Sequence, residues 1–177
     1  MTTQTLRPAS DTIPAACALL GQVRSLAGSI DDERYTTPSA SMFGATIGAH
    51  VRHTLDHFRA ALTGLEGDVV DYDHRDRATA IEQSVDAAIA EIDALAGAIG
   101  AIGEEDAARG VTVRVMLSGD GACAELSTTL ARELAFAAHH GVHHNAMIKA
   151  ICCELGVETP EGFGKAPSTI QHENTRG

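Results

Sequence analysis

Histidine is the residue type in this chain whose number and spacing could do chemistry, because seven of its nine histidines lie in two short segments. The imidazole nitrogen is a common protein ligand for Zn²⁺, Ni²⁺ and Fe²⁺. The two segments therefore predict a site for one divalent metal ion. The seven residues are His50, His53 and His57 in the first segment, and His139, His140, His143 and His144 in the second.

In each segment the spacing turns several rings to one side of a helix. His50, His53 and His57 are at positions i, i+3 and i+7, which fall within about 60° of one another on an α-helix. His140 and His144 form an HxxxH pair, and His144 also lies on the apolar stripe of its segment. Such a pair, with a third histidine from a facing helix, can hold one ion at about 2.0 to 2.1 Å and leave a position open for water or substrate.

Glu133 precedes His140 by two helical turns and lies on the same face. Carboxylates commonly accept a hydrogen bond from the free ring nitrogen of a metal-bound histidine. We therefore expect Glu133 to hold such a nitrogen, or a bound water, from beside the metal site.

A purely structural network of histidines is the alternative to a metal site. A single histidine that faces a core is usually a hydrogen-bonded structural residue, and we interpret His74 and His172 in this way. Seven rings need many more partners, and the two segments offer few nearby carboxylates besides Asp56 and Glu133. The number of histidines therefore favours metal binding.

Four helical segments are expected to position these histidines. Apolar residues repeat at three- and four-residue steps over about 12–29, 42–64, 78–100 and 123–155. A charged loop over 64–78 connects the second and third segments, and the apolar run 111–117 predicts one short extended segment before the last helix. This pattern predicts an all-α, up-and-down four-helix bundle in a single domain spanning 1–177, with flexible ends at 1–11 and 171–177.

Composition limits the partners and the compartment. The 177 residues carry a net charge of -11, so the surface as a whole should repel a phosphate backbone, and we expect no nucleic-acid partner. No run approaches the roughly 18 to 20 apolar residues of a membrane-spanning helix, which predicts no membrane partner. Four cysteines that form neither a disulfide framework nor a CxxC pair favour a reducing cytoplasm.

Association with a second copy of the chain is also expected. Aromatic residues make up only 3% of the sequence, and four helices of this length leave flat, alanine-rich surfaces that a monomer would expose. Two-fold dimers are the commonest assembly of soluble homo-oligomers. We therefore predict a homodimer with helix-to-helix packing at its interface.

Three motifs together resemble the DinB/YfiT superfamily, which is distinct from the DNA polymerase of the same name. The motifs are TIGAHVRH at 46–53, RELAF at 132–136 and HGVHH at 140–144. The resemblance covers nearly the whole chain and implies a four-helix bundle that binds one divalent metal and often dimerises. Matched by motif, the ligands are His140, His144 and His53, with His50 close enough to compete, while His57, His139 and His143 are left as residues of the pocket or surface.

The resemblance also extends to 72–77 and 163–170, which look like features of an uncharacterised DinB-like subgroup. Relatives with known chemistry include S-transferases and isomerases that use a low-molecular-weight thiol, and others are described as metal-dependent hydrolases. The resemblance thus implies a metal-dependent enzyme of thiol S-transferase or hydrolase type that acts on a small-molecule substrate. This chain lacks an obvious anion-binding cluster near the histidines, because Arg52 and Arg59 are predicted on the opposite side of their helix.

A non-catalytic protein, in which the metal only staples the bundle or is stored, would use the same ligands. A closed shell of His50, His53, His140 and His144 would favour that alternative. A di-iron centre needs carboxylate bridges and ExxH or HxxxE spacings, which these segments lack. No catalytic acid or base is assigned from the sequence.

Overall fold

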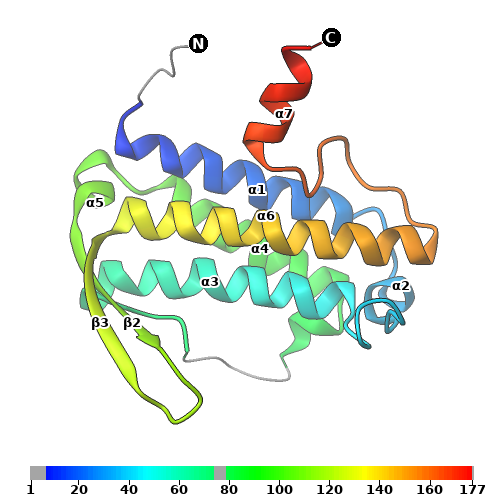
Figure 1. Cartoon of the computed structure of the whole chain (residues 1–177), viewed down its shortest axis with the longest axis horizontal. Coiled ribbons are helices and arrows are strands. Elements are labelled where there is room, and N and C mark those ends of the chain that lie inside the picture. Colours follow the sequence, from blue (N-terminus) through cyan, green and yellow to red (C-terminus); the bar gives the residue numbers. More distant parts are fainter. Residues whose placement is uncertain (1–6, 74–78, 177) are drawn as a thin grey trace.

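The computed structural model describes residues 7–73 and 79–176, so His74 lies outside the described residues. Figure 1 shows how the elements are arranged. In chain order they are η1 (Ala9–Asp11), α1 (Thr12–Ala27), α2 (Asp32–Thr36), α3 (Ile47–Gly67), β1 (Val69–Asp71), η2 (Ala80–Glu82), α4 (Val85–Gly100), α5 (Glu104–Ala108), β2 (Gly110–Met116), β3 (Cys123–Thr129), α6 (Leu130–Leu155) and α7 (Pro167–Asn174).

Four long helices, α1, α3, α4 and α6, lie side by side and enclose the main core (Figure 1). Helix α6 packs against α1 and α3, and α4 packs against the same two helices. Each helix contributes fully buried or nearly fully buried apolar side chains, for example Leu20, Leu55, Ile92 and Leu134. Since burying one such side chain stabilises the fold by about 1.5 to 3 kcal/mol, these stripes hold the helices together.

Side-chain caps mark the start of three of the four long helices. The hydroxyl oxygens of Thr46, Ser84 and Thr129 accept hydrogen bonds from backbone N–H groups in the first turns of α3, α4 and α6. Gly156 ends α6 in the left-handed conformation, with φ of 66°, which glycine adopts without a Cβ penalty. The two helices that carry the histidine segments therefore have defined starting points.

A three-stranded mixed sheet lies beside the helices, and the prediction of an all-α fold was therefore wrong. Strand β1 pairs parallel with β2, and β2 pairs antiparallel with β3. A second small core of Ala60, Val70, Val111 and Val113 packs the sheet against α3. The extended segment predicted over 111–117 overlaps β2, whereas β1 lies in the predicted loop and β3 in the predicted start of the last helix.

The reason for the error is the competition between local propensity and strand pairing. Ala124, Glu125 and Leu126 favour a helix by themselves. In the structure, however, all seven residues of β3 pair with β2, and this pairing gives partners to the backbone groups that face β2. Tertiary contacts thereby override a weak local preference.

Helix boundaries also differ from those predicted. Helix α3 begins at Ile47 rather than near 42, α4 at Val85 rather than near 78, and α6 at Leu130 rather than near 123. The short helices α2, α5 and α7 were not predicted. Of the ends expected to be flexible, residues 1–6 and 177 lie outside the described residues, and 171–174 belong to α7. No helix in the described part of the chain is both long and apolar enough to cross a membrane.

Substitution of Gly48, in the first turn of α3, tests how closely this helix approaches its neighbours. A Cβ at this position would meet the backbone oxygen of Glu82 and, at 2.8 Å, the ring of Tyr35. We expect Gly48→Ala to lower the free energy of unfolding by about 1 to 3 kcal/mol, because a backbone atom must move to make room. Urea unfolding monitored by circular dichroism measures this change.

Gly97 on α4 is the matched control, because a Cβ there would have no neighbour within 4 Å. Gly97→Ala should raise the stability by about 0.5 to 1 kcal/mol through helix propensity alone. Equal unfolding midpoints for Gly48→Ala and the unmodified chain would contradict the close approach.

Candidate metal centre

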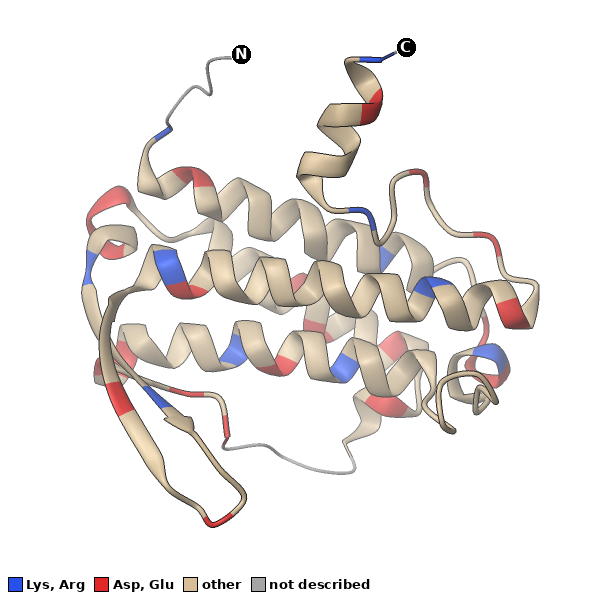
Figure 2. Ribbon diagram, in the orientation of Figure 1, with Lys and Arg blue, Asp and Glu red and all other residues tan. Residues whose placement is uncertain are grey.

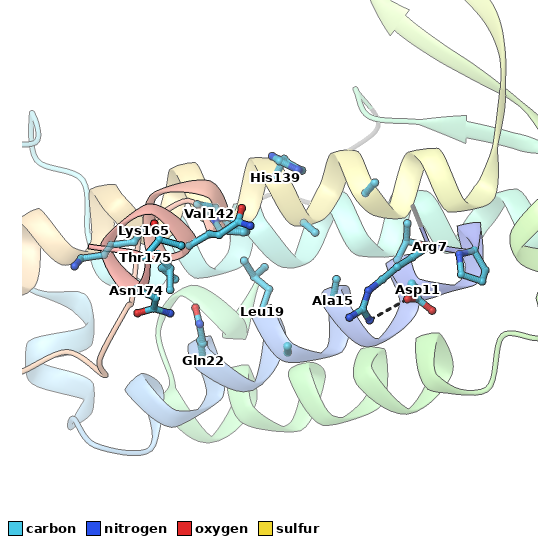
Figure 3. Close-up of a pocket in the computed structure, with 18 residues that line it drawn as sticks. Arg7, Asp11, Ala15, Leu19, Gln22, His139, Val142, Lys165, Asn174 and Thr175 are labelled. Atoms are coloured by element: carbon cyan, nitrogen blue, oxygen red, sulfur yellow. Dashed lines mark hydrogen bonds and ion pairs between the residues drawn. The ribbon is translucent and has the colours of Figure 1, made fainter. Parts of the chain in front are cut away.

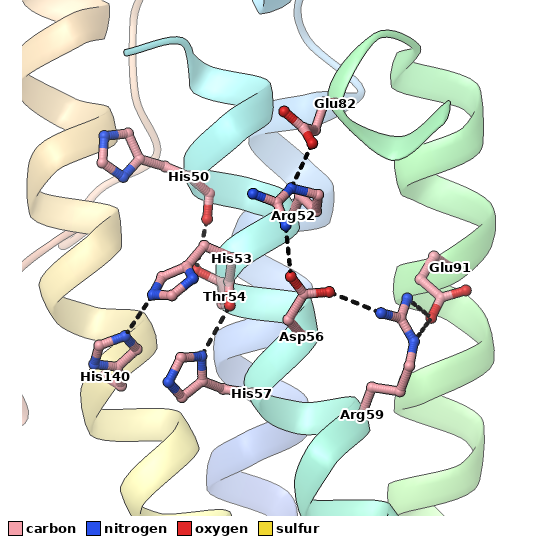
Figure 4. A network of polar contacts seen from close by, with 10 residues as sticks. All are labelled: His50, Arg52, His53, Thr54, Asp56, His57, Arg59, Glu82, Glu91 and His140. Carbon is pink, nitrogen blue, oxygen red and sulfur yellow. Dashed lines mark hydrogen bonds and ion pairs between the residues drawn. The ribbon is translucent and has the colours of Figure 1, made fainter. Parts of the chain in front are cut away.

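The two histidine segments face each other across the contact between α3 and α6. His50 lies opposite His144, and His53 lies opposite His140. Since one residue number rises as the other falls, the two helices run antiparallel here. Figure 4 shows the α3 rings directed toward α6, with Arg52 and Arg59 on the other side of α3. The packing of two helices thus gathers rings that lie about 90 residues apart in the sequence.

Three ring nitrogens converge at the centre of this contact. The Nε2 atom of His140 lies 3.1 Å from Nε2 of His53 and 3.0 Å from Nε2 of His144. His53, His57 and His140 also form a group in which one nitrogen from each ring lies within 4.8 Å of the others. His53 and His140 are common to both arrangements.

A divalent cation fits between His140 and each of its two neighbours. Two nitrogens bound to one ion at about 2.0 to 2.1 Å lie no more than about 4.2 Å apart, and both Nε2 distances meet that limit. In addition, a ring nitrogen carries one in-plane proton or one lone pair. His140 Nε2 therefore cannot make a full hydrogen bond to both neighbours, whereas a shared cation would accommodate both contacts.

His57 and His50 occupy the two ends of the group. The ring of His57 stacks on His140, with centroids 4.0 Å apart, and its Nδ1 lies 3.0 Å from the backbone oxygen of His53. His50 Nδ1 lies 2.9 Å from Nδ1 of His144, the nitrogen that faces away from His140. His50 Nε2 is buried and has no hydrogen-bond partner within the described part of the chain. His50 therefore lies behind His144, whereas His57 offers a further ring nitrogen near those of His53 and His140.

The other predicted residues lie at different distances from this centre. The ring of His143 packs on His144 at a centroid distance of 5.4 Å and on His140 at 6.2 Å. His139 lies elsewhere, since it lines a groove between α1, α6 and α7 (Figure 3). The structure thus gathers six of the seven clustered histidines and leaves out His139.

A model of the DinB superfamily matches residues 19–148, more than half of the chain. The chain belongs to the DinB superfamily. This confirms the resemblance inferred from the three motifs. FK506-binding protein 5 of Rhizopus delemar is 50% identical over 48 residues, which cover 27% of this chain and 12% of that relative. No solved structure gives a significant match.

Burial lowers the pKa of two histidines at the centre of this DinB-superfamily chain. His144 is only 8% exposed, and burial, together with the neighbouring rings of His53 and His140, lowers its pKa to about 3. Burial, reinforced by His143, also lowers the pKa of His50. These two imidazoles are therefore neutral at pH 7, the form in which a ring nitrogen offers its lone pair to a metal.

Glu133 reaches the histidines through Tyr72. Its fully buried carboxylate accepts hydrogen bonds from the hydroxyls of Tyr72 and Thr128, each at 2.8 Å, and from Arg132 at 2.9 Å. The Tyr72 ring stacks on His57 at a centroid distance of 5.2 Å. Burial and the bond to Glu133 raise the pKa of Tyr72, so its hydroxyl remains a donor.

Sequence spacing did not identify Tyr72 or Phe136 as neighbours of the site. Tyr72 follows β1, a strand that the sequence did not predict, and no helical period relates it to His57. Phe136 lies one turn before His140 on α6, and that i, i+4 relation was the available signal. Its ring packs near His57 and His140, at centroid distances of 6.0 and 5.8 Å.

The lowered pKa of His144 predicts how the stability of metal-free protein changes with pH. The folded-state pKa is about 3 and the ordinary value is 6.5, so the unfolded chain takes up a proton first as the pH falls. The contribution of His144 is complete above about pH 6.5 and is lost between about pH 6.5 and 3, by up to about 1.4 kcal/mol per pH unit.

His144→Asn isolates this effect from the titration of carboxylates. After treatment with a chelator, urea unfolding between pH 7.5 and 5 should give a steeper loss of stability for the unmodified chain than for the variant. Parallel stability curves would show that His144 is not held neutral by the fold.

Proposed function

We propose that this chain is a metal-dependent enzyme that binds one divalent ion through Nε2 of His53, His140 and His144 and acts on a small molecule, by thiol S-transfer or hydrolysis. The observation that carries the proposal is the contact of His140 Nε2 with Nε2 of both neighbours, at 3.1 Å from His53 and 3.0 Å from His144. Membership of the DinB superfamily supports it. Imidazole suits Zn²⁺, Ni²⁺ and Fe²⁺ alike, so the ligands leave the choice among these metals open.

When bound, such an ion lowers the pKa of a coordinated water or thiol and so supplies a nucleophile at neutral pH. The residues of the chain prepare the site for that chemistry. His50 holds the ring of His144 through the Nδ1 contact, and Tyr72 supports the ring of His57. Phe136, which is 37% exposed, lies between the centre and the surface, with its ring 5.8 Å from that of His140.

A non-catalytic, metal-stapled protein is the alternative function. It would be favoured by four histidines that close the shell around the ion. His50 instead lies against Nδ1 of His144, on the far side of that ring from Nε2 of His140. This placement removes His50 from the shell, and we propose that His57 stays outside it too, stacked on His140, so that three ligands and an open position remain, the arrangement that catalytic sites keep.

Metal content tests the ligand assignment. We expect about one equivalent of divalent metal in untagged protein after repletion, and less than about one tenth of that in His140→Ala and His144→Ala, because each variant removes one of three donors. Elemental analysis of dialysed protein provides the measurement.

His139→Ala is the matched control. It removes a histidine from the same helix, but His139 lines the groove and not the metal centre. His172→Ala on α7 is a second control. Undiminished metal in His140→Ala, or equal losses in all four variants, would refute the assignment.

We also infer that the chain forms a homodimer. A groove of about 800 Å³ between α1, α6 and α7 has an alanine-rich lining that includes Ala15, Ala18, Ala135 and Ala138 (Figure 3). Small side chains allow a helix of a second copy to approach closely.

We also propose that the protein resides in a reducing cytoplasm, because its four cysteines are free.

Ala18→Arg tests the dimer, since it adds a charge to the exposed floor of the groove. Light scattering at micromolar concentration should give the mass of two chains for the unmodified protein and one chain for this variant. Ala94→Arg, on the exposed face of α4, should remain dimeric. A single-chain mass for the unmodified protein at all concentrations would exclude the dimer.

A further inference from the structure

One side of α6 carries a cation, an aromatic ring and a candidate metal ligand in succession. Arg132, Phe136 and His140 are spaced by four residues and fall within about 80° of one another around the helix. The ring of Phe136 is stacked near that of His140, with centroids 5.8 Å apart and an interplanar angle of 23°. The guanidinium carbon of Arg132 lies 5.4 Å from the centroid of Phe136. These three side chains, the α6 strip, form a continuous surface.

The α6 strip is accessible at the end away from the histidines. Phe136 is 37% exposed, whereas Phe58 and Phe163 in the main core are fully buried. The Arg132 side chain is 62% exposed. A ligand that reaches His140 from this side would therefore pass over an aromatic ring and then meet a guanidinium group.

The ion pair of Arg132 with Glu133 orients the guanidinium and leaves other N–H donors for a ligand. One nitrogen of Arg132 donates to Glu133 at 2.9 Å, while a guanidinium has five N–H donors. The carboxylate of Glu133 is fully buried and also accepts bonds from Tyr72 and Thr128. A ligand at the surface thus meets the cation and not its acidic partner.

We propose, resting on the function proposed above, that the α6 strip binds an elongated substrate with a carboxylate at one end, an apolar middle and a metal-binding donor at the other end. The carboxylate pairs with Arg132, the apolar part lies on Phe136, and the donor reaches the centre at His140. Eight residues of helix separate Arg132 from His140, a rise of about 12 Å. In a chain of net charge -11, a placed cation is needed to attract an anion to this side.

The test uses protein loaded with Co²⁺ and two thiols of equal length, 8-mercaptooctanoic acid and 8-mercapto-1-octanol. Binding of each is followed by the thiolate-to-Co²⁺ absorption band, which reports on the centre without any assay of activity. We expect the acid to bind about 10-fold more tightly than the alcohol, because a charge-assisted hydrogen bond replaces a neutral one. Raising the salt concentration should reduce the difference.

Variants test whether Arg132 causes the tighter binding of the acid. Arg132→Gln should bind both thiols equally, with unchanged Co²⁺ content, and Arg132→Lys should retain part of the preference because it keeps the charge. Phe136→Ala should weaken both thiols by a similar factor. Arg24→Gln, which removes another exposed arginine that pairs with a carboxylate, should behave as the unmodified chain.

The outcomes separate this inference from the function on which it rests. Equal affinity for the two thiols in the unmodified chain, with an absorption band for both, would overturn the α6 strip as a carboxylate site and leave the metal centre standing. Loss of preference in Arg24→Gln as well as Arg132→Gln would overturn it too. The absence of a band with either thiol would overturn the open metal position and the inference together.

Discussion

The close, antiparallel packing of α3 against α6 is the constraint on which the site depends. It brings His50, His53 and His57 against His140 and His144 in a partly buried space, where unpaired polar atoms are costly. Gly141 of α6 lies where three helices meet, since a Cβ there would meet Leu19 of α1 and lie 3.2 Å from Thr54 of α3. The packing of α3 against α6 therefore both buries the imidazoles and brings their nitrogens together.

The two faces of α3 carry different kinds of polar side chain. The side away from α6 carries a closed ion-pair network, in which Arg52 bonds Glu82 at 2.6 Å and Asp56 at 2.9 Å, and Arg59 joins Asp56 to Glu91 (Figure 4). Two arginines pair with three carboxylates in this network and link α3 to η2 and α4. The side toward α6 carries the imidazole rings of His50, His53 and His57, which face His140 and His144. On this side, ring nitrogens of α3 and α6 come within hydrogen-bond distance of one another.

The sheet contributes to the site although it holds no histidine within its described strands. Strand β1 pairs with β2 and leads directly into Tyr72, whose ring packs on His57 and whose hydroxyl bonds Glu133. The start of α6, set by its cap at Thr129, places Glu133 and Arg132 at the same end of the site. One helix therefore links the histidines, the buried carboxylate and the exposed cation.

The sequence by itself determined the features that depend on local spacing. The helical period located the cores of the long helices, the i, i+4 rule paired His140 with His144, and motifs identified the DinB superfamily. Only the tertiary structure decided what depends on contacts between distant segments. Pairing with β2 made 123–129 a strand, and helix packing set His50 against the far nitrogen of His144 and Tyr72 against His57. Helical period fixes the face of one helix on which a side chain lies, but strand pairing and helix packing depend on residues far away in the sequence.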